Sequence, residues 1–319
     1  MTHRILLTGG CGYVGTPLAQ TLESLGYFVR IVDSQWFGNF HNEKTNNIEV
    51  IKKRVDQIDE SDLNGIDTVI HLANIANDPG VELNPVLSWE VNTLHLAQLL
   101  QKCRISAIDT FINASSGSVY GVKVDDKVTE DLELIPISAY NKTKMVAERI
   151  VLSYQDYFRV VNVRPATVCG FSPRMRFDVV VNMFVLQAFQ NQKIIVLGGS
   201  QVRPNIHIED MISVYVHLIN EGKQVKGDIN AGFENLKIVD IAKLVAKQME
   251  CEIVIKESND PRSYRQDSTK LINSGFSPKK GVREAIFEIH ERLKSGTLKD
   301  DTLWHTVSTM KSLGLDQKV

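Results

Sequence analysis

The stretch Arg4–Gly15 reads RILLTGGCGYVG, an apolar run that breaks into a glycine-rich turn. A helical pattern follows directly over Tyr13–Leu25. A short strand, a turn of this kind and a helix are typical of the opening of a βαβ unit. In such a unit the main-chain N–H groups at the helix N-terminus can bind a pyrophosphate. The stretch therefore predicts a dinucleotide-binding turn at the start of the fold.

Three glycines of this turn have separate expected roles. Gly9 allows the tight turn, Gly12 lets the main chain approach a phosphate, and Gly15 lets the helix pack on the sheet. We place Tyr13 and Val14, which lie between the last two glycines, in the same cofactor-binding turn. The alternative is an ordinary surface turn, because glycine-rich turns occur in many folds.

An acidic residue ends the second predicted strand. This strand, Phe28–Val32, leads into Asp33, where a dinucleotide-binding unit has the carboxylate that binds the adenosine ribose. A carboxylate accepts hydrogen bonds from a 2′-hydroxyl and repels a 2′-phosphate, so NAD is favoured over NADP. Asp56 follows the next predicted strand, Ile48–Arg54, and we expect this second carboxylate at the adenine edge.

The composition excludes several classes of protein. The chain has 319 residues, 43% of them hydrophobic, and a net charge of −2, which gives no basic face for nucleic acid or an anionic membrane. Its four cysteines are far apart and no histidines stand at ligand spacing, so we expect neither disulfides nor a metal site. The sequence has no signal-peptide pattern and no apolar run near the roughly eighteen residues of a membrane span. We therefore expect a cytoplasmic protein.

Strands and helices alternate up to about residue 170. Compact apolar runs at Thr68–Leu72, Thr110–Ala114 and Phe158–Val163 predict buried strands, and Pro85–Cys103 has helical spacing. This alternation predicts an α/β fold with a Rossmann-type, doubly wound parallel sheet. We assign Leu72 and Ala73 to the nicotinamide side of the cofactor site, and count Asn92 among the cofactor-binding residues as well. Within its helix we expect Asn92 to cap or bridge rather than to react.

The alternation becomes less regular in the second half of the chain. We expect residues 1–170 to form an NAD-binding Rossmann domain, and residues 171–319 a smaller C-terminal α/β lobe that closes over a substrate cleft. We also expect the chain to cross back between the two. The segment Gly198–Pro204, which contains Arg203, has the glycines and proline of a turn-rich loop.

A candidate catalytic pair lies on the helix that begins near Ala139. Tyr140 and Lys144 are four residues apart and therefore lie on one helix face. Lowering the pKa of a tyrosine from about 10 to about 7 requires about 4 kcal/mol of stabilisation of the phenolate. The Lys144 ammonium and a positive nicotinamide ring have the right charge for this shift. The alternative is a surface tyrosine and a solvated lysine with no relationship.

Small hydroxyl residues follow the fifth predicted strand, at the sheet edge where an open α/β fold has its active site. Ser116 lies in this loop, and we expect it to hold a substrate hydroxyl beside Tyr140. Together these residues fit proton abstraction from an alcohol while a hydride passes to NAD, or the reverse reaction.

The chain resembles the extended short-chain dehydrogenase/reductases, specifically the NAD-dependent nucleotide-sugar epimerase/dehydratase family, over nearly its whole length. The matching positions are Thr8-Gly9-x-x-Gly12-x-x-Gly15, Asp33, Asp56, His71-Leu72-Ala73, Asn92, Ser115-Ser116-x-Ser118-Val119-Tyr120-Gly121, Tyr140-x-x-x-Lys144 and Arg203 through His207 to Asp210. The resemblance implies NAD as cofactor and a catalytic set of Ser116, Tyr140 and Lys144.

The resemblance also implies a nucleotide-diphosphate sugar as the substrate. We assign Ser118 and Arg174 to substrate binding, and Arg203 and Arg262 match family positions that contact the diphosphate. Either of the last two could instead be an ordinary surface arginine. The family's usual homodimer pairs two helices of each subunit, which correspond here to Pro85–Cys103 and Ala139–Tyr154.

Departures from the family's sub-patterns narrow the expected reaction. Gly117 and Ser118 stand where the family's 4,6-dehydratases have an Asp-Glu pair, and no cysteine stands near Ser118 as in its 3,5-epimerases. Hydride chemistry at sugar C4 remains, and a nucleotide-sugar 4-epimerase is our first expectation. The alternatives are a 4-dehydrogenase or 4-ketoreductase that releases its product, a non-catalytic NAD-binding sensor, and a dehydrogenase of a lipid or small metabolite.

Overall fold

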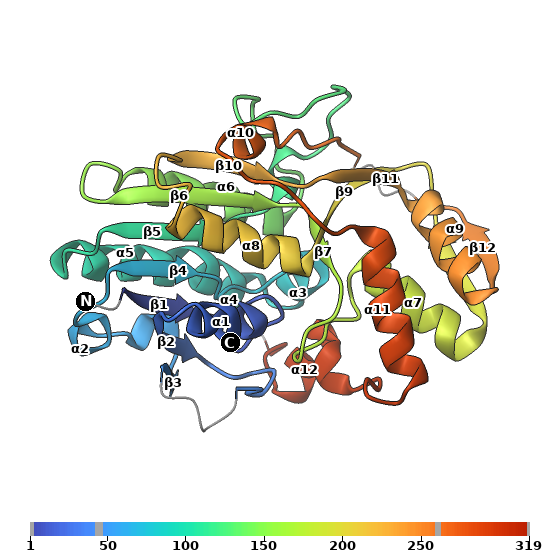
Figure 1. Cartoon of the computed structure of the whole chain (residues 1–319), viewed down its shortest axis with the longest axis horizontal. Coiled ribbons are helices and arrows are strands. Elements are labelled where there is room, and N and C mark those ends of the chain that lie inside the picture. Colours follow the sequence, from blue (N-terminus) through green and yellow to red (C-terminus); the bar gives the residue numbers. More distant parts are fainter. Residues whose placement is uncertain (1–2, 42–46, 259–262, 318–319) are drawn as a thin grey trace.

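A parallel sheet forms the centre of the computed structural model, which describes residues 3–41, 47–258 and 263–317 (Figure 1). Within these residues the sheet has seven strands in the order β10-β6-β5-β4-β1-β2-β3, all parallel. Their bounds are β1 Arg4–Thr8, β2 Phe28–Asp33, β3 Ile48–Lys52, β4 Thr68–His71, β5 Thr110–Ala114, β6 Arg159–Pro165 and β10 Gly227–Ala231. This order confirms the predicted doubly wound α/β fold.

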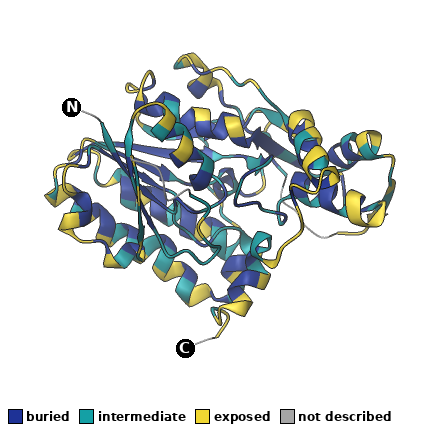
Figure 2. Ribbon diagram, turned by 60° about the horizontal axis from the view of Figure 1, so that its bottom comes forward, coloured by how far each residue is buried: buried dark blue, intermediate teal, exposed yellow. Residues whose placement is uncertain are grey.

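Helices cover both faces of the sheet. Those on one face are α1 (Gly15–Ser24) and α8 (Ile208–Ile219), and those on the other are α5 (His95–Ile105) and α6 (Ala139–Leu152). Side chains of β1 alternate between the two cores: Ile5 and Leu7 pack with the first pair of helices and Leu6 with the second. Figure 2 accordingly shows buried strands between helices whose outer faces are exposed. Burial on both faces explains why these strands read as continuous apolar runs.

The remaining elements form smaller units beside and around the sheet. One unit is a three-stranded sheet in the order β11-β9-β7, and another is the parallel pair β12-β8. Helices α7, α9 and α11 pack against one another at the right of Figure 1. The bounds are β7 Thr167–Cys169, β8 Lys193–Leu197, β9 Val202–His207, β11 Glu234–Lys237, β12 Glu252–Lys256, α2 Glu60–Leu63, α3 Asp78–Leu83, α4 Pro85–Trp89, α7 Val180–Asn191, α9 Ile238–Met249, α10 Thr269–Asn273, α11 Val282–Lys294 and α12 Thr306–Ser312. Short helical turns lie at η1 Val55–Gln57, η2 Glu90–Leu94, η3 Gly117–Tyr120 and η4 Thr302–Trp304.

The chain crosses back to the main sheet after residue 171. Helix α8 packs on α1, and β10 pairs with β6 and forms an edge strand of the main sheet. The division of the chain at residue 170 stays a prediction. The expected loop Gly198–Pro204 was partly wrong, because Val202 already begins β9, which pairs with β7 on one side and β11 on the other. Partners far away in the sequence decide this strand, and Pro204 within it had favoured a loop.

The helix expected over Pro85–Cys103 is interrupted. Its first part is α4, the π-helical turn η2 follows, and α5 completes it. Asn92 lies in the π turn, and its side chain accepts a hydrogen bond from the Ile75 N–H at 2.8 Å and donates to the Ile75 carbonyl at 3.1 Å. The predicted bridging role of this asparagine is confirmed. A π turn adds a residue to the helix, and here it turns Asn92 toward the loop after β4.

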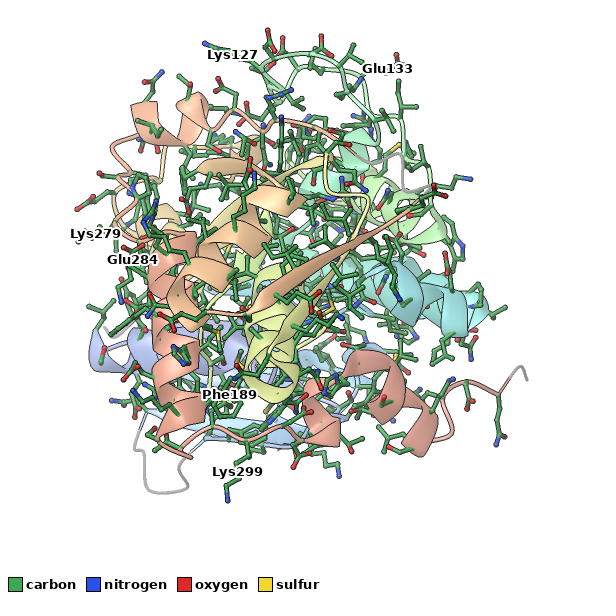
Figure 3. All side chains as sticks on the ribbon, turned by 90° about the vertical axis from the view of Figure 1, so that its right-hand side faces the viewer. Lys127, Glu133, Phe189, Lys279, Glu284 and Lys299 are labelled. Carbon is green, nitrogen blue, oxygen red and sulfur yellow. The ribbon has the colours of Figure 1, made fainter. Side chains whose placement is uncertain are left out.

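Charged side chains of both signs share the surface. Figure 3 shows Lys127 and Glu133 extending from the loop between η3 and α6, and Lys279 and Glu284 at the beginning of α11. This mixture agrees with the small net charge. No helix in the described ranges has the length and hydropathy needed to cross a bilayer.

Candidate active site

A cavity of about 580 Å³ lies where the central strands end. Ligands of open α/β sheets bind at the carboxyl ends of the strands, so this is the expected place for a cofactor and substrate. The predicted site residues that line it are Gly9, Gly12, Tyr13, Val14, Gly15, Asp33, Leu72, Ala73, Ser116, Ser118, Tyr140, Arg174 and Arg203. The cavity thus joins the glycine-rich turn to the candidate catalytic residues.

The glycine-rich turn has the close packing that its glycines predict. Gly9 has a φ of +72°, and a Cβ built there would lie 2.6 Å from the main-chain nitrogen of Ala73. A Cβ on Gly15 would clash with the carbonyl oxygen of Gly9. Val14 precedes α1 and supplies no side-chain hydrogen bond to its first turn, so no side chain caps the N-terminus of this helix. These features fit the pyrophosphate of a dinucleotide.

Asp33 connects the glycine-rich turn to the next loop. Its carboxylate accepts a hydrogen bond from the Cys11 N–H at 2.9 Å and one from the Gln35 N–H at 2.6 Å. Burial raises the pKa of this carboxyl, whereas these hydrogen bonds and the nearby Arg174 charge lower it. The side chain lines the cavity at the end of β2, which is the position expected for the ribose-binding carboxylate.

Arg174 lies beside Asp33. Its guanidinium stacks 4.1 Å from the ring centroid of Phe37, and it interacts with the Asp33 charge. Burial lowers the pKa of Arg174 to about 10, and the neighbouring Arg176 contributes to this shift. The sequence placed Arg174 at the substrate, but its neighbours in the structure are those of the expected cofactor ribose.

The hydroxyl groups of the candidate catalytic residues meet in the same cavity. The Ser116 hydroxyl lies 2.8 Å from that of Ser118 and also forms a hydrogen bond with the Tyr140 phenol. Ser138 caps α6 as predicted, accepting a hydrogen bond from the Asn141 N–H at 3.1 Å. The cap fixes the start of the helix at Ala139, so Tyr140 lies in its first turn, where the phenol is presented to the loop that carries Ser116.

Lys144 is buried one turn further along α6. Its ammonium donates a hydrogen bond of 2.8 Å to the carbonyl oxygen of Ala114, at the end of β5. Burial lowers the pKa of Lys144 to about 7, and the charge of Glu148 acts in the opposite direction. At neutral pH this lysine is therefore protonated only in part.

Several groups set the electrostatic environment of Tyr140. Burial raises the pKa of this phenol, while hydrogen bonds from Ser116 and the Asn77 main chain, together with the Arg176 charge, lower it. The expected lowering came from Lys144 together with the positive nicotinamide ring, and it stays a prediction. The charge of Arg176, which the sequence did not indicate, also lowers the pKa of this phenol.

Other predicted residues lie away from the cavity wall or outside the described ranges. Asp56 was expected at the adenine edge, but its carboxylate pairs with the Arg54 guanidinium at 3.0 Å and lies 3.7 Å from His95. The expected contact of Asp56 with adenine stays a prediction. Asn92 and Lys144 do not line the cavity, but they form hydrogen bonds with the main chains of Ile75 and Ala114, which do. Arg262 lies outside the described residues.

A buried ion pair between Arg164 and Glu148 lies next to Lys144 along α6 and was not expected from the sequence. The Arg164 guanidinium contacts both oxygens of Glu148, at 2.9 and 2.8 Å, and Asp228 at 2.6 Å. Ser115 donates a further hydrogen bond to Glu148. The signal was visible in the sequence, because Glu148 continues the four-residue spacing of Tyr140 and Lys144 along one helix face.

Comparison with known families decides the assignment. The model of the NAD dependent epimerase/dehydratase family matches residues 5–232, which include the glycine-rich turn, Ser116, Tyr140 and Lys144. This chain belongs to that family. The family member is therefore an enzyme with NAD as its cofactor, and the predicted resemblance is confirmed.

Relatives of this family member differ in the reactions that their names give. UDP-glucuronic acid decarboxylase 1 of Danio rerio is 30% identical over 89% of this chain and 71% of its own length. The uncharacterized UDP-glucose epimerase YtcB of Bacillus subtilis is 29% identical over 76% of this chain and 81% of its own length.

A solved structure supports the same assignment. The UDP-glucuronic acid 4-epimerase of Bacillus cereus, in complex with UDP-glucuronic acid and NAD, is 27% identical and superposes with a TM-score of 0.80. The comparison covers 92% of this chain and 99% of the other. The shared fold therefore includes both the sheet and the smaller units beside it.

Proposed function

We propose that this family member is a nucleotide-sugar 4-epimerase in which Ser116, Tyr140 and Lys144 carry the reaction. The observation on which this rests is that the Ser116 and Tyr140 hydroxyls share one cavity with the glycine-rich turn and Asp33. A site of this kind brings an alcohol, a proton acceptor and a dinucleotide together. Proton removal and hydride transfer at one carbon are the steps that C4 epimerisation requires.

In this proposal each residue has a separate task. Bound NAD, held by Asp33 and the turn Gly9–Gly15, would supply the hydride acceptor and donor for sugar C4. The Tyr140 phenolate takes the proton from the C4 hydroxyl and gives it back after the sugar has turned. Ser116 donates a hydrogen bond that orients this hydroxyl, and Lys144 binds the nicotinamide ribose.

Binding is proposed to divide along the cavity. Asp33 and the turn Gly9–Gly15 hold the cofactor, because a carboxylate and a helix N-terminus suit its ribose and pyrophosphate. Ser118 and Arg203 line the cavity, and we propose that they contact the nucleotide-diphosphate sugar. Arg262 is proposed for the same diphosphate from its sequence position alone.

A second candidate function follows from the relatives named as UDP-glucuronic acid decarboxylases. If the sugar has a carboxylate at C5, oxidation at C4 produces a β-keto acid, which can lose carbon dioxide without a further catalytic group. The same Tyr140 and Ser116 would serve this reaction. A 4-dehydrogenase or 4-ketoreductase that releases its product remains the other alternative.

Incubation with a panel of neutral, N-acetylated and uronic-acid nucleotide sugars separates these functions. An epimerase converts one 4-epimer into the other without net NADH, a dehydrogenase accumulates NADH, and a decarboxylase releases carbon dioxide only from the uronic acid. No turnover and no change in nicotinamide absorbance across the panel would contradict all three of these functions.

The Tyr140→Phe variant tests the mechanism directly. We expect turnover to fall at least about 1000-fold, because the variant has no group to take the C4 proton, while NAD binding stays within about twofold. Tyr157→Phe is the matched control, since Tyr157 is 58% exposed and lies away from the cavity. Turnover retained in Tyr140→Phe would contradict the proposal.

A further inference from the structure

A segment from the second half of the chain reaches the candidate catalytic end of the cavity. It contains Arg176 and Asp178, and Arg176 lines the cavity together with Tyr140. The Arg176 Nε donates to one oxygen of Asp178 at 2.6 Å, and both side chains are largely buried, with exposures of 16% and 22%. A guanidinium held in this way has a defined position, unlike that of a surface arginine.

Asp178 is itself anchored from two directions. The Asn77 side-chain amide donates to its second oxygen at 2.9 Å, and Thr306 at the start of α12 forms another hydrogen bond with it. Burial opposes the charged carboxylate, but Arg176 and these hydrogen bonds lower the pKa of Asp178 to about 2. The Arg176 and Asp178 pair therefore stays ionised over the pH range in which the enzyme is assayed.

Asn77 brings the same cluster to the phenol. It has a φ of +70°, a conformation that non-glycine residues rarely adopt, and its side-chain oxygen accepts a hydrogen bond from the Gly80 N–H at 2.9 Å. With its side chain bound to both Gly80 and Asp178, the residue is held in this conformation, in which its main-chain N–H acts on the Tyr140 hydroxyl. Strain of this kind is common at functional sites.

Other charged groups also lie near Tyr140. Asp78 is negative and disfavours the phenolate, and Asp178 is paired with Arg176. Lys144 donates to the Ala114 carbonyl one turn further along α6. Arg176 adds a positive charge from the second half of the chain that favours the ionised phenol.

We propose that Arg176 is a positioning residue for the Tyr140 base: the second half of the chain delivers its guanidinium, held by Asp178 and Asn77, to the phenol, where it stabilises the phenolate. The inference rests on the proposed role of Tyr140. It goes beyond that role because the competence of the base then depends on how the segment with Arg176 docks against α6, and not on α6 alone.

The test is the pH at which Tyr140 ionises in Arg176→Met. Tyrosinate absorbance of the NAD-loaded protein, taken as the difference from the same protein with Tyr140→Phe, isolates this one phenol. We expect its midpoint to rise by about one pH unit or more, and the acidic limb of the kcat/KM profile to move by the same amount. Turnover at a fixed pH on that limb then falls roughly tenfold per unit.

Two variants provide the controls. Arg176→Lys keeps the charge and should keep most of the wild-type midpoint. Arg292→Met removes a cation that stacks 3.7 Å from the ring centroid of Phe171 and does not line the cavity, so it should leave the Tyr140 midpoint unchanged. A midpoint in Arg176→Met that is unchanged or lower overturns the inference, even when Tyr140→Phe is inactive as the proposed function requires. If Arg176→Met does not unfold cooperatively, the Tyr140 midpoint is measured in Arg176→Gln instead, and the same outcomes support or overturn the inference.

Discussion

Burial works against each ionisable group that the proposed chemistry needs. Tyr140 and Lys144 both lie in the dry interior, where desolvation favours the neutral phenol and the neutral amine. The protein opposes this with a small number of placed groups: Ser116 and Arg176 at the phenol, and Glu148 below the ammonium. At the scale of single residues, the site therefore depends on neighbours that a four-residue spacing does not reveal.

Lys144 should couple stability to pH. Its pKa is lowered by burial from 10.5 to about 7, so between these values the unfolded chain binds more protons than the folded one. The free energy of unfolding then rises with pH through this window, and Lys144→Met removes the contribution. We expect the difference between wild type and Lys144→Met to grow by about 2 kcal/mol from about pH 7 to about pH 9, measured by urea unfolding. A difference that stays flat or decreases would show that this lysine is protonated throughout.

At the scale of elements, two glycines of the turn between β1 and α1 have different tasks, one in packing the helix and one in binding the cofactor. The missing side chain of Gly15 lets α1 lie against the Gly9 carbonyl, whereas a Cβ on Gly12 would meet only that carbonyl oxygen, at 3.1 Å. The two glycines therefore have different tasks within one short motif.

Alanine at these two positions should change different properties: the free energy of unfolding at Gly15 and the affinity for NAD at Gly12. Gly15→Ala forces α1 away from the turn and should cost about 1–3 kcal/mol of unfolding free energy. Gly12→Ala should change stability by less than about 1 kcal/mol but weaken NAD binding at least about tenfold, because its methyl group occupies the approach to the phosphate. Urea unfolding and NAD titration measured on both variants check this. Equal losses of stability would contradict the division of roles.

The interrupted helix shows the limits of periodicity. Its apolar spacing correctly indicated helix over Pro85–Cys103, but the π turn at Glu90–Leu94 exists because Asn92 bonds to the main chain of Ile75. That partner lies in another loop and is not visible in the spacing.

At the scale of the whole molecule, exposed apolar residues support the expected homodimer. Val86 is 69% exposed on α4 and Leu94 is 53% exposed on η2, both within the segment proposed to pair. Large apolar side chains grouped in this way are typical of interaction surfaces.

We expect light scattering to give twice the 35.8 kDa mass of one chain, and the double variant Val86→Glu with Leu94→Glu to give a monomer. Charged groups placed in an apolar interface lose hydration without gaining partners. Phe189→Glu is the control: Phe189 is 40% exposed on α7, a different part of the surface (Figure 3), and should not change the mass. A monomeric wild type at working concentration would rule the dimer out.

The cavity also belongs to the whole molecule. Its walls come from loops after β1, β2, β4 and β5, and from the segment with Arg174 and Arg176 in the second half of the chain. A change in how that segment docks would therefore alter both the Asp33 end and the Tyr140 end of the site.

The sequence by itself determined the sheet, the cofactor and the Tyr140 and Lys144 pair, because apolar runs, glycine positions and helical spacing are local properties of the chain. Only the tertiary structure decided that β9 pairs on both sides, that Arg174 shares a cavity with Asp33, and that the charge of Arg176 acts on the phenol. Each of these depends on groups that are distant in sequence and become neighbours only when the chain folds, and electrostatic effects in a buried site follow distance in space.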